Sequence, residues 1–549
     1  MFWLNILIFS LVLKVSLSFN YGMKVSDVHE ELRRSKQCKE IIAYYLERGY
    51  LYNPILGAII SFNPNAISDA IKLDNYYKAN KTFVGKLHCV PILVKDNIAV
   101  ANIPMTGGIK ALRYSIPHTD ADIIEKLKAE GAIIIAKANL AEMAFSSYDS
   151  EMGGKCYNPW DLTRSCSRSS SGSGCGVAAD LAVISIGTDT DGSIMGPASN
   201  NGVFGLRPAH NKVSSEGVFI VIESDDTIGP LANNLHDLVL THSIMAGNLS
   251  IYESFTNEKL FKPTDIRIGY IKNFMLGFTL DFEDDGTYYY KVEPEVKDAF
   301  DKTVSNFKNI NINVIELEIE NKVFESMLND LKIIYSIRYF GCGLKCIKTN
   351  FDNFFSNQQR FQRDSQYHSA EDVLSSKLLS PFFEDILVNN NFSASECRDY
   401  CKEYIQLKEK FAQTIDSWYK TVSPAVDIIL FPTSIRIPYL LNDSSNEYLT
   451  ATIFPTLSEY ASLSIPVAFT SVKTNAPDGL PMGMMLMGSD NNLLKIFNAA
   501  KLYEDKYLKQ KKIPRSVPII TDKCSNSNTK QFSYFSFINF ALVLFVLKI

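Results

Sequence analysis

The sequence predicts an α/β fold in which helices cover a sheet that contains parallel strands. Residues 90–145 run from a short apolar strand to a helix stopped by Gly131, and then to a buried strand that passes into another helix. This alternation is typical of layered α/β folds, in which each crossover helix packs on the sheet. A small-residue helix leads into a second strand and a loop at 178–193. Because neither a repeat nor a convincing linker interrupts 24–510, one large domain is expected.

The other elements follow from hydrophobic periodicity. Residues 24–80 have the period of amphipathic helices, and the first helix is expected to end at Gly49. Residues 320–420 are predicted to be mostly helical and carry no motif that can be interpreted. Three later segments have the apolar character of strands, namely DIRIGYI, NVIELEI and GLPMGMMLMG.

Composition places the chain among ordinary globular proteins. Its 549 residues are 46% hydrophobic and 21% charged, which argues against a disordered, collagen-like or many-pass membrane protein. The net charge of -5 and the pI of about 5.9 give no sign of a basic face, so no nucleic-acid partner is predicted. The seven histidines lack metal-binding spacing and no Cys-x-x-Cys pair occurs, so neither a metal nor another cofactor is predicted.

Both ends of the chain are more apolar than its middle. The apolar run at 2–13 is followed by small residues, which is typical of a signal peptide, here 1–18. The polar stretch and apolar tail of 516–549 have the pattern of a GPI-attachment signal, and the last eighteen residues could instead just span a bilayer. Helices packed on the domain are the alternatives at both ends. We therefore predict the secretory pathway and a cell-surface or extracellular location, with the tail as a membrane contact.

Four cysteines stand in two similarly spaced pairs. Cys342 and Cys346 lie one helical turn apart, as do Cys397 and Cys401. In an exported protein, two disulfides could join two antiparallel helices at these positions. Ordinary buried thiols are the alternative.

Three segments carry residues suited to catalysis. The serine-rich run at 165–176 leads directly into an apolar segment, unlike a solvated linker. Ser193 follows a buried strand in a glycine-containing loop, where successive backbone N–H groups can form an anion hole. Lys95 ends an apolar strand, where burial can lower its pKa and make it a general base for a serine. The alternative for Lys95 is an exposed or ion-paired lysine beside Asp96. No G-x-S-x-G motif occurs, which disfavours the common Ser-His-Asp hydrolases.

Taken in this order, the three pieces resemble the amidase signature family. The resemblance covers roughly 28–510, and its blocks include GKLHCVPILVKDNI, DADIIEKLKAEGAIIIAKANLAEMAF, GTDTDGSIMGPASNNGVFGLRPA and GLPMGMMLMG. It implies a single large α/β/α domain, here 24–515, with a mixed, twisted central sheet flanked by helices. It also implies hydrolysis or transfer of carboxamides by a Ser-Ser-Lys triad, without a cofactor.

Residue by residue, the resemblance makes Ser193 the nucleophile, Ser169 the bridging serine and Lys95 the base. It further implies that the Arg168–Ser169 peptide bond is cis. Backbone N–H groups of the nucleophile loop would bind the substrate oxyanion, from the following residues: Thr190, Asp191, Gly192 and Ser193.

The chain departs from the family pattern close to these residues. Ser167-Arg168 and Ser171 stand where glycine is usual, Asp191 replaces a glycine, and Met195 replaces an arginine. A carboxylate at 191 would oppose a developing oxyanion unless it is paired or points away. We hypothesise that Asp191 pairs with Arg168.

Three functions from different classes are compatible with the sequence. The leading prediction is a secreted or surface-anchored amidohydrolase that cleaves a small or lipid-like amide through an acyl-enzyme, with a homodimer allowed. The first alternative is a catalytically impaired family member that acts as a non-enzymatic surface protein. The second alternative is the A-type subunit of a tRNA-dependent amidotransferase.

Overall fold

The computed structural model describes residues 19–145, 150–257, 261–272, 292–356, 369–390, 392–421, 425–441, 452–471, 476, 479–508, 514 and 516. Residues Gly22–Val517 form one compact unit. The predicted signal peptide at 1–18 and the apolar tail at 532–549 lie outside the described residues. In the described part, no helix is both long enough and apolar enough to cross a membrane.

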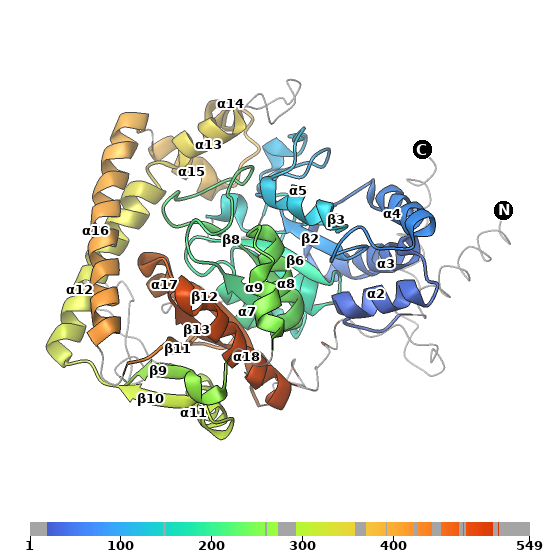
Figure 1. Ribbon diagram of the computed structural model, residues 1–549. Coiled ribbons are helices and arrows are strands. Elements are labelled where there is room, and N and C mark those ends of the chain that lie inside the picture. Colours follow the sequence, from blue (N-terminus) through green and yellow to red (C-terminus); the bar gives the residue numbers. More distant parts are fainter. Residues whose placement is uncertain are drawn as a thin grey trace. The chain divides into compact units, whose positions relative to one another are not determined.

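A mixed sheet of 11 strands forms the centre of this unit, in the order β1-β3-β2-β6-β8-β7-β12-β13-β11-β9-β10 (Figure 1). Strand β1 is antiparallel to β3 at one edge, the runs β3-β2-β6 and β11-β9-β10 are parallel, and the strands between these two runs are antiparallel, as in β12-β13. The strands are β1 (Ile59–Phe62), β2 (Pro91–Lys95), β3 (Ile133–Ala138), β6 (Ile184–Asp189), β7 (Phe204–Arg207), β8 (Thr227–Ala232), β9 (Arg267–Ile271), β10 (Asn313–Leu317), β11 (Ile428–Pro432), β12 (Ala461–Phe469) and β13 (Pro481–Gly488), and the small hairpin outside the sheet is β4 (Tyr157–Asn158) with β5 (Asp161–Ser165).

Helices cover both faces of the sheet, which confirms the predicted α/β/α architecture. The helices are α2 (Val25–Arg33), α3 (Cys38–Leu56), α4 (Ala66–Asn80), α5 (Asp122–Ala129), α6 (Ser171–Ala178), α7 (Met195–Asn201), α8 (Leu235–Met245), α9 (Ser250–Thr256), α11 (Pro294–Asn309), α12 (Asn321–Ser336), α13 (Ile347–Phe355), α14 (Ala370–Ser375), α15 (Pro381–Asn389), α16 (Ala394–Thr421), α17 (Ile453–Ser458) and α18 (Leu493–Tyr507).

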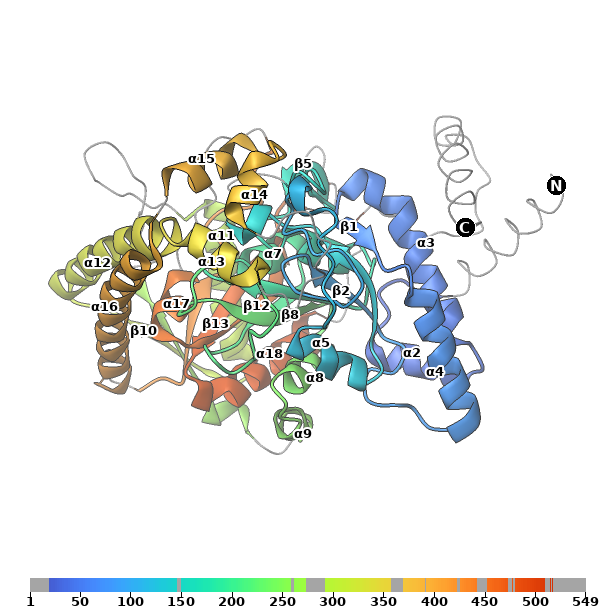
Figure 2. The ribbon, with the colours of Figure 1, turned by 90° about the horizontal axis from the view of Figure 1, so that it is seen from above.

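The main hydrophobic core lies on the face of the sheet that α8, α11 and α18 cover. Side chains of β7 such as Phe204 and Leu206 point into this core, where they meet Leu238 of α8 and Phe497 of α18. The opposite face of β7 carries α7, and the two elements approach so closely that a Cβ at Gly205 would lie 2.6 Å from the Cβ of Ala198. Figure 2 shows α8 and α18 on one side of the sheet and α7 on the other. The sheet is therefore buried on both faces, and every residue of β2 and β6 is buried.

The first predicted helix differs from the structure. It is interrupted after Arg33 and resumes at Cys38, and α3 continues past Gly49 to Leu56. Gly49 lies inside α3 and packs closely against β1. A Cβ at this position would be 2.7 Å from Phe62 Cε1, which explains why the residue is a glycine. The helix ends instead at Gly57, whose φ of 61° suits a glycine. The prediction was wrong because Gly49 is needed for close packing within the helix, and the glycine that ends the helix is Gly57.

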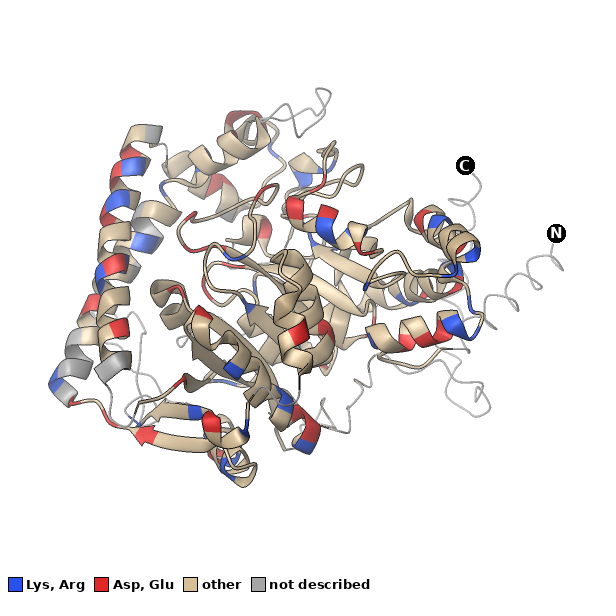
Figure 3. Cartoon of the chain, viewed as in Figure 1, with Lys and Arg blue, Asp and Glu red and all other residues tan. Residues whose placement is uncertain are grey.

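The region predicted to be helical between 320 and 420 consists of α12 to α16, with a π-helical segment, η4 (Ile337–Gly343), directly after α12. Helices α12 and α16 lie side by side in both ribbon views (Figures 1 and 2). Acidic and basic residues are interspersed along α16 (Figure 3), as is typical of a helix with a solvated face.

One disulfide joins the two cysteine pairs for which bridges or buried thiols were the alternatives. Cys342 of η4 is bonded to Cys401 of α16, whereas Cys346 and Cys397 form no disulfide and are buried thiols. A second disulfide joins Cys38 to another cysteine, Cys89, which the spacing of the cysteines did not indicate. Helical spacing indicated that the first two segments could be joined but not which cysteines pair, and the second disulfide joins segments whose proximity depends on the tertiary fold.

Candidate active site

Lys95 lies at the carboxyl end of β2, completely buried between β3 and β6. Its Nζ donates hydrogen bonds to Ser169 Oγ at 2.7 Å and to Thr188 Oγ1 at 2.8 Å. Burial lowers the pKa of Lys95 to about 7, although the charges of Asp189 and Asp226 oppose this shift. The lysine is thus near the point of losing its proton at neutral pH, which a general base requires.

The alternative interpretation of Lys95, an ion pair with Asp96, does not describe the structure. The carboxylate of Asp96 instead lies 2.8 Å from the Nζ of Lys137 on the neighbouring strand, and both side chains are fully buried. Successive residues of a strand point to opposite faces, so Lys95 and Asp96 cannot both face one partner. This separation leaves Lys95 directed at the serine-rich run.

The serine-rich run is a buried structural segment, and the expectation that it is not a linker is confirmed. The Arg168–Ser169 peptide bond is cis, as the resemblance implied. The hydroxyl of Ser170 donates to the carbonyl oxygen of Thr188 at 3.1 Å, and that of Ser173 donates to Ile186 O at 3.1 Å, so α6 is attached to β6. These bonds hold Ser169 against Lys95.

The loop after β6 brings Ser193 next to the serine-rich run. The backbone N–H of Ser170 donates to the carbonyl oxygen of Ser193 at 3.2 Å, so the two serine segments are in direct contact. No hydrogen bond of the Ser193 hydroxyl is formed among the described residues, and its side chain is only partly buried. The structure therefore brings Lys95, Ser169 and Ser193 together, with the lysine already bonded to the first serine.

Asp189 organises this loop, and sequence reasoning missed its role. Its carboxylate accepts hydrogen bonds from the backbone N–H groups of Gly192 at 2.8 Å and Ile194 at 2.6 Å, and a longer one from Met195. The N–H of Gly192, which was expected to bind the oxyanion, is therefore directed at Asp189. Gly192 has a φ of 87°, so the glycine is needed for the turn. The position of Asp189 at the end of a buried strand was the available signal.

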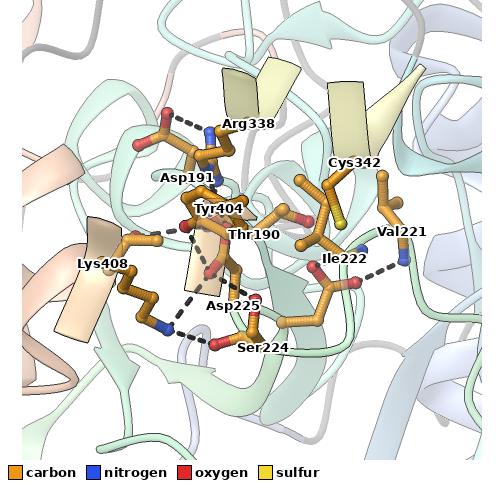
Figure 4. A network of polar contacts seen from close by, with 12 residues as sticks. Thr190, Asp191, Val221, Ile222, Ser224, Asp225, Arg338, Cys342, Tyr404 and Lys408 are labelled. Carbon is orange, nitrogen blue, oxygen red and sulfur yellow. Dashed lines mark hydrogen bonds and ion pairs between the residues drawn. The ribbon is translucent and has the colours of Figure 1, made fainter. Parts of the chain in front are cut away.

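Asp191 has a different partner from the one hypothesised. Its Oδ2 lies 3.2 Å from Nη1 of Arg338, in η4 (Figure 4). Its Oδ1 accepts a hydrogen bond from Thr452 Oγ1 at 3.2 Å. The hypothesised Asp191–Arg168 pair is thus replaced by a pair between residues 147 apart in the sequence. No local pattern could have indicated Arg338.

Ser167 occupies a backbone conformation that favours glycine. Its φ is 65°, in the left-handed region, at one of the positions where the resemblance led us to expect glycine. The side chain is completely buried, and its Oγ has no hydrogen-bond partner in the described structure. Both features cost free energy, since a buried hydroxyl without a partner loses its hydration.

Ser167→Gly should therefore stabilise the protein by about 1 kcal/mol, because it relieves the backbone and removes the unsatisfied hydroxyl. Thermal unfolding of the two proteins would measure the shift in Tm. Ser173→Gly is the matched control: Ser173 lies inside α6 and its hydroxyl is bonded, so its loss should destabilise the protein by about 1–2 kcal/mol. A lower Tm for Ser167→Gly than for the unmodified chain would contradict this account.

Sequence comparison relates this chain to known proteins over most of its length. The family model described as Amidase matches residues 40–492. One A-type subunit of glutamyl-tRNA(Gln) amidotransferase from Clostridium acetobutylicum is 29% identical over 489 residues, which are 86% of this chain and 96% of that protein. The A-type subunit of the glutamyl-tRNA(Gln) amidotransferase of Methanosarcina acetivorans is 28% identical over 498 residues, 88% of this chain and 96% of the relative.

Solved structures share the fold. The native peptide amidase of Stenotrophomonas maltophilia superposes with a TM-score of 0.71 at 24% identity, covering 90% of this chain and 99% of that one. The A-type subunit of the glutamyl-tRNA(Gln) amidotransferase of Thermotoga maritima gives a TM-score of 0.62 at 21% identity, covering 91% and 99%.

Two expectations from the sequence are corrected by these findings. The predicted secretory pathway and cell-surface location are wrong: the relatives are subunits of glutamyl-tRNA(Gln) amidotransferases, and nothing in the comparisons indicates export. That prediction depended on two apolar runs, and apolar composition is shared by export signals and by segments buried for other reasons. The exclusion of nucleic-acid partners is also wrong as an inference, because the relatives are named as subunits of an enzyme of glutamyl-tRNA(Gln). Net charge describes the whole chain and not a binding face.

Proposed function

Since this chain belongs to the amidase family, we propose that it cleaves the C–N bond of a carboxamide by nucleophilic attack of Ser193. The observation that carries the proposal is the 2.7 Å hydrogen bond between Lys95 Nζ and Ser169 Oγ at a fully buried lysine. A neutral lysine can accept a proton from a serine, and the residue after Ser169 donates its backbone N–H to the carbonyl oxygen of Ser193.

The reaction proceeds in two halves. Ser193 Oγ attacks the amide carbonyl carbon while its proton passes through Ser169 to Lys95. The C–N bond then breaks, and the same relay returns the proton to the departing nitrogen, which leaves as ammonia or an amine. Water next attacks the acyl-enzyme ester, its proton following the same path, and the carboxylic acid is released with Ser193 restored.

The oxyanion of the tetrahedral intermediate requires hydrogen-bond donors. The N–H groups of Thr190, Asp191 and Ser193 are the donors we assign, whereas Gly192 donates to Asp189 and serves the shape of the loop. One such donor is typically worth about 3 kcal/mol of transition-state stabilisation. A carboxylate next to these donors works against them, so the pairing of Asp191 with Arg338 is relevant to catalysis.

Two substrate classes are compatible with this chemistry. The names of the sequence relatives favour an amidotransferase A-type subunit, which would release ammonia from an amide donor for transfer to glutamyl-tRNA(Gln). A stand-alone hydrolase of small or lipid-like amides uses the same residues. Neither Ser193 nor Lys95 distinguishes the two classes, because both begin with cleavage of a carboxamide.

Assays of ammonia or amine release distinguish the amidotransferase subunit from the stand-alone hydrolase. The purified full chain should release ammonia or amine from at least one member of a panel of glutamine, asparagine, and short-chain, aryl and fatty amides. Glutamine turnover that increases when glutamyl-tRNA(Gln) and partner subunits are added supports the amidotransferase role, whereas turnover of simple amides without them supports the hydrolase. Ser193→Ala should be inactive, and Ser173→Ala, a buried serine of the same segment that does not contact Lys95, should remain active. Failure of the whole panel together with failure of a fluorophosphonate to label Ser193 would support the non-catalytic alternative.

A further inference from the structure

Arg338 connects the helical region 321–421 to the loop that carries Ser193 (Figure 4). The arginine is almost completely buried, with 2% of its surface exposed, and three of its nitrogens have separate acceptors. Nε donates to Asp225 Oδ2 at 2.6 Å, Nη1 to Asp191 Oδ2 at 3.2 Å, and Nη2 to the carbonyl oxygen of Thr190 at 3.0 Å. One guanidinium thereby binds both residues that precede Gly192 in the nucleophile loop.

The position of Arg338 is fixed from the opposite side by α16. Asp225 also accepts hydrogen bonds from the hydroxyl of Tyr404 and from Lys408 Nζ, at 2.7 and 3.2 Å. Tyr404 and Lys408 follow Cys401 by one and two turns of α16, and Cys401 is bonded to Cys342, one turn after Arg338. The disulfide and the Asp225 contacts therefore hold η4 and α16 in register beside the loop.

The loop itself supplies no cation to balance Asp191. Residues 190–195 read TDGSIM and contain neither lysine nor arginine. Arg207 is directed at the other acidic residue, since its Nη1 lies 2.9 Å from the carbonyl oxygen of Asp189 and 3.6 Å from Asp189 Oδ1. Among the described residues, Arg338 is thus the basic residue in contact with the Asp191 carboxylate.

We propose that Arg338 is a positioning residue for amide cleavage: it orients the N–H groups of the nucleophile loop and neutralises the Asp191 carboxylate beside the oxyanion. This role follows from its geometry. Together with Thr456 Oγ1, which donates to the same oxygen at 3.2 Å, the contact with Thr190 O orients the peptide plane whose N–H belongs to Asp191, because a carbonyl and the next N–H share one rigid plane. A lysine could not replace it, since a single ammonium cannot reach three acceptors that a guanidinium reaches with separate nitrogens.

The kinetic part of this inference rests on the proposed function at Ser193, so its test uses a reaction that does not depend on knowing the substrate. A fluorophosphonate reacts covalently with an activated serine, and its rate constant can be separated from its binding constant. Arg338→Met should lower the rate constant for labelling of Ser193 by about 100-fold, with the binding constant changed by less than about threefold. Arg338→Lys, which keeps the charge, should lose about tenfold and provides the measurement if Arg338→Met does not fold.

Two further variants separate positioning from general destabilisation. Lys408→Met removes one of the two donors that α16 gives to Asp225, but Tyr404, the Cys342–Cys401 disulfide and the contacts of Arg338 itself remain to hold the arginine. Labelling should therefore stay within about threefold of the unmodified chain even if Tm falls. Asp191→Gly removes the carboxylate that needs neutralising. Added to Arg338→Met, it should restore labelling by about tenfold, because two residues in contact are coupled.

The outcomes that would overturn the inference are distinct from failure of the proposed function. If Lys408→Met slows labelling as much as Arg338→Met does, or if Asp191→Gly restores nothing, Arg338 has only a structural role. If the unmodified chain is not labelled at all, the proposed function fails. The Tm values of Arg338→Met, Asp191→Gly and the double variant then decide whether Arg338 and Asp191 are coupled. If the double variant loses less Tm than the two single variants do together, Arg338 is retained as the partner that fixes Asp191. If the decreases in Tm are additive, Arg338 is excluded from that role.

Discussion

Replacing Lys95 by methionine should lower kcat/KM for amide cleavage by about 10⁴-fold or more, the loss seen when a member of a catalytic triad is removed. The same lysine sets the pH dependence of the unmodified chain. Its pKa is lowered to about 7 by burial, and only its neutral form can accept the serine proton. Therefore kcat/KM should be constant well above pH 7 and should fall about tenfold for each pH unit below it.

Lys137→Met is the matched control for this prediction. Lys137 is as deeply buried as Lys95 and lies on the next strand, but it pairs with Asp96 and does not contact the serines. Its loss should cost stability, because it leaves Asp96 buried without its partner, while the midpoint of the pH profile should not move. A kcat/KM that stays flat between pH 5 and 9 on the unmodified chain would be inconsistent with Lys95 as the base.

Replacing Asp189 by alanine should destabilise the protein by about 3–5 kcal/mol. The substitution removes the acceptor of three backbone N–H groups in the nucleophile loop and leaves Arg207 without a nearby carboxylate in a fully buried site. Unpaired buried donors cost the free energy of their lost hydration, and an unpaired buried charge costs more. Thermal unfolding would show this as a large decrease in Tm, accompanied by loss of Ser193 labelling.

Asp189→Asn tests which part of that loss is due to charge. The amide keeps one oxygen that can accept from the loop but no longer balances Arg207, so its decrease in Tm should be clearly smaller than that of the alanine variant. Equal stability of Asp189→Ala and the unmodified chain would mean that the loop is held by other contacts. The hydrogen bond between Arg338 and the carbonyl oxygen of Thr190 would then be the first of these contacts to test by substitution.

The local part of the fold was predictable because it depends on spacing along the chain. The period of apolar residues indicated α3, α5 and the helices of 320–420, and short apolar runs indicated β9, β10 and β13. Strand β1 was missed, since four residues between two long helices give too few periods to identify. Gly49 was misinterpreted because its function, contact with Phe62, lies outside its own helix.

The candidate site was predictable to a smaller extent. The order of the lysine strand, the serine run and the nucleophile loop contributed to a family resemblance, and that resemblance implied Lys95, Ser169 and Ser193, which the structure places together. The partner of Asp191 was not predictable, because Arg338 is distant in sequence and comes from a region without a motif. The location inferred from the apolar ends was wrong, since composition alone cannot distinguish the reasons for which a segment is apolar.

The sequence by itself determined the class of the fold, the family resemblance and the residues expected to react, because each of these depends on residue type and on spacing over short stretches. Only the tertiary structure decided which charges meet. Lys95 faces Ser169 while its neighbour Asp96 faces Lys137, and Asp191 meets Arg338 and not Arg168. The physical reason is that electrostatic and hydrogen-bond interactions act over a few ångströms in space, and the packing of sheet and helices sets which residues come within that distance.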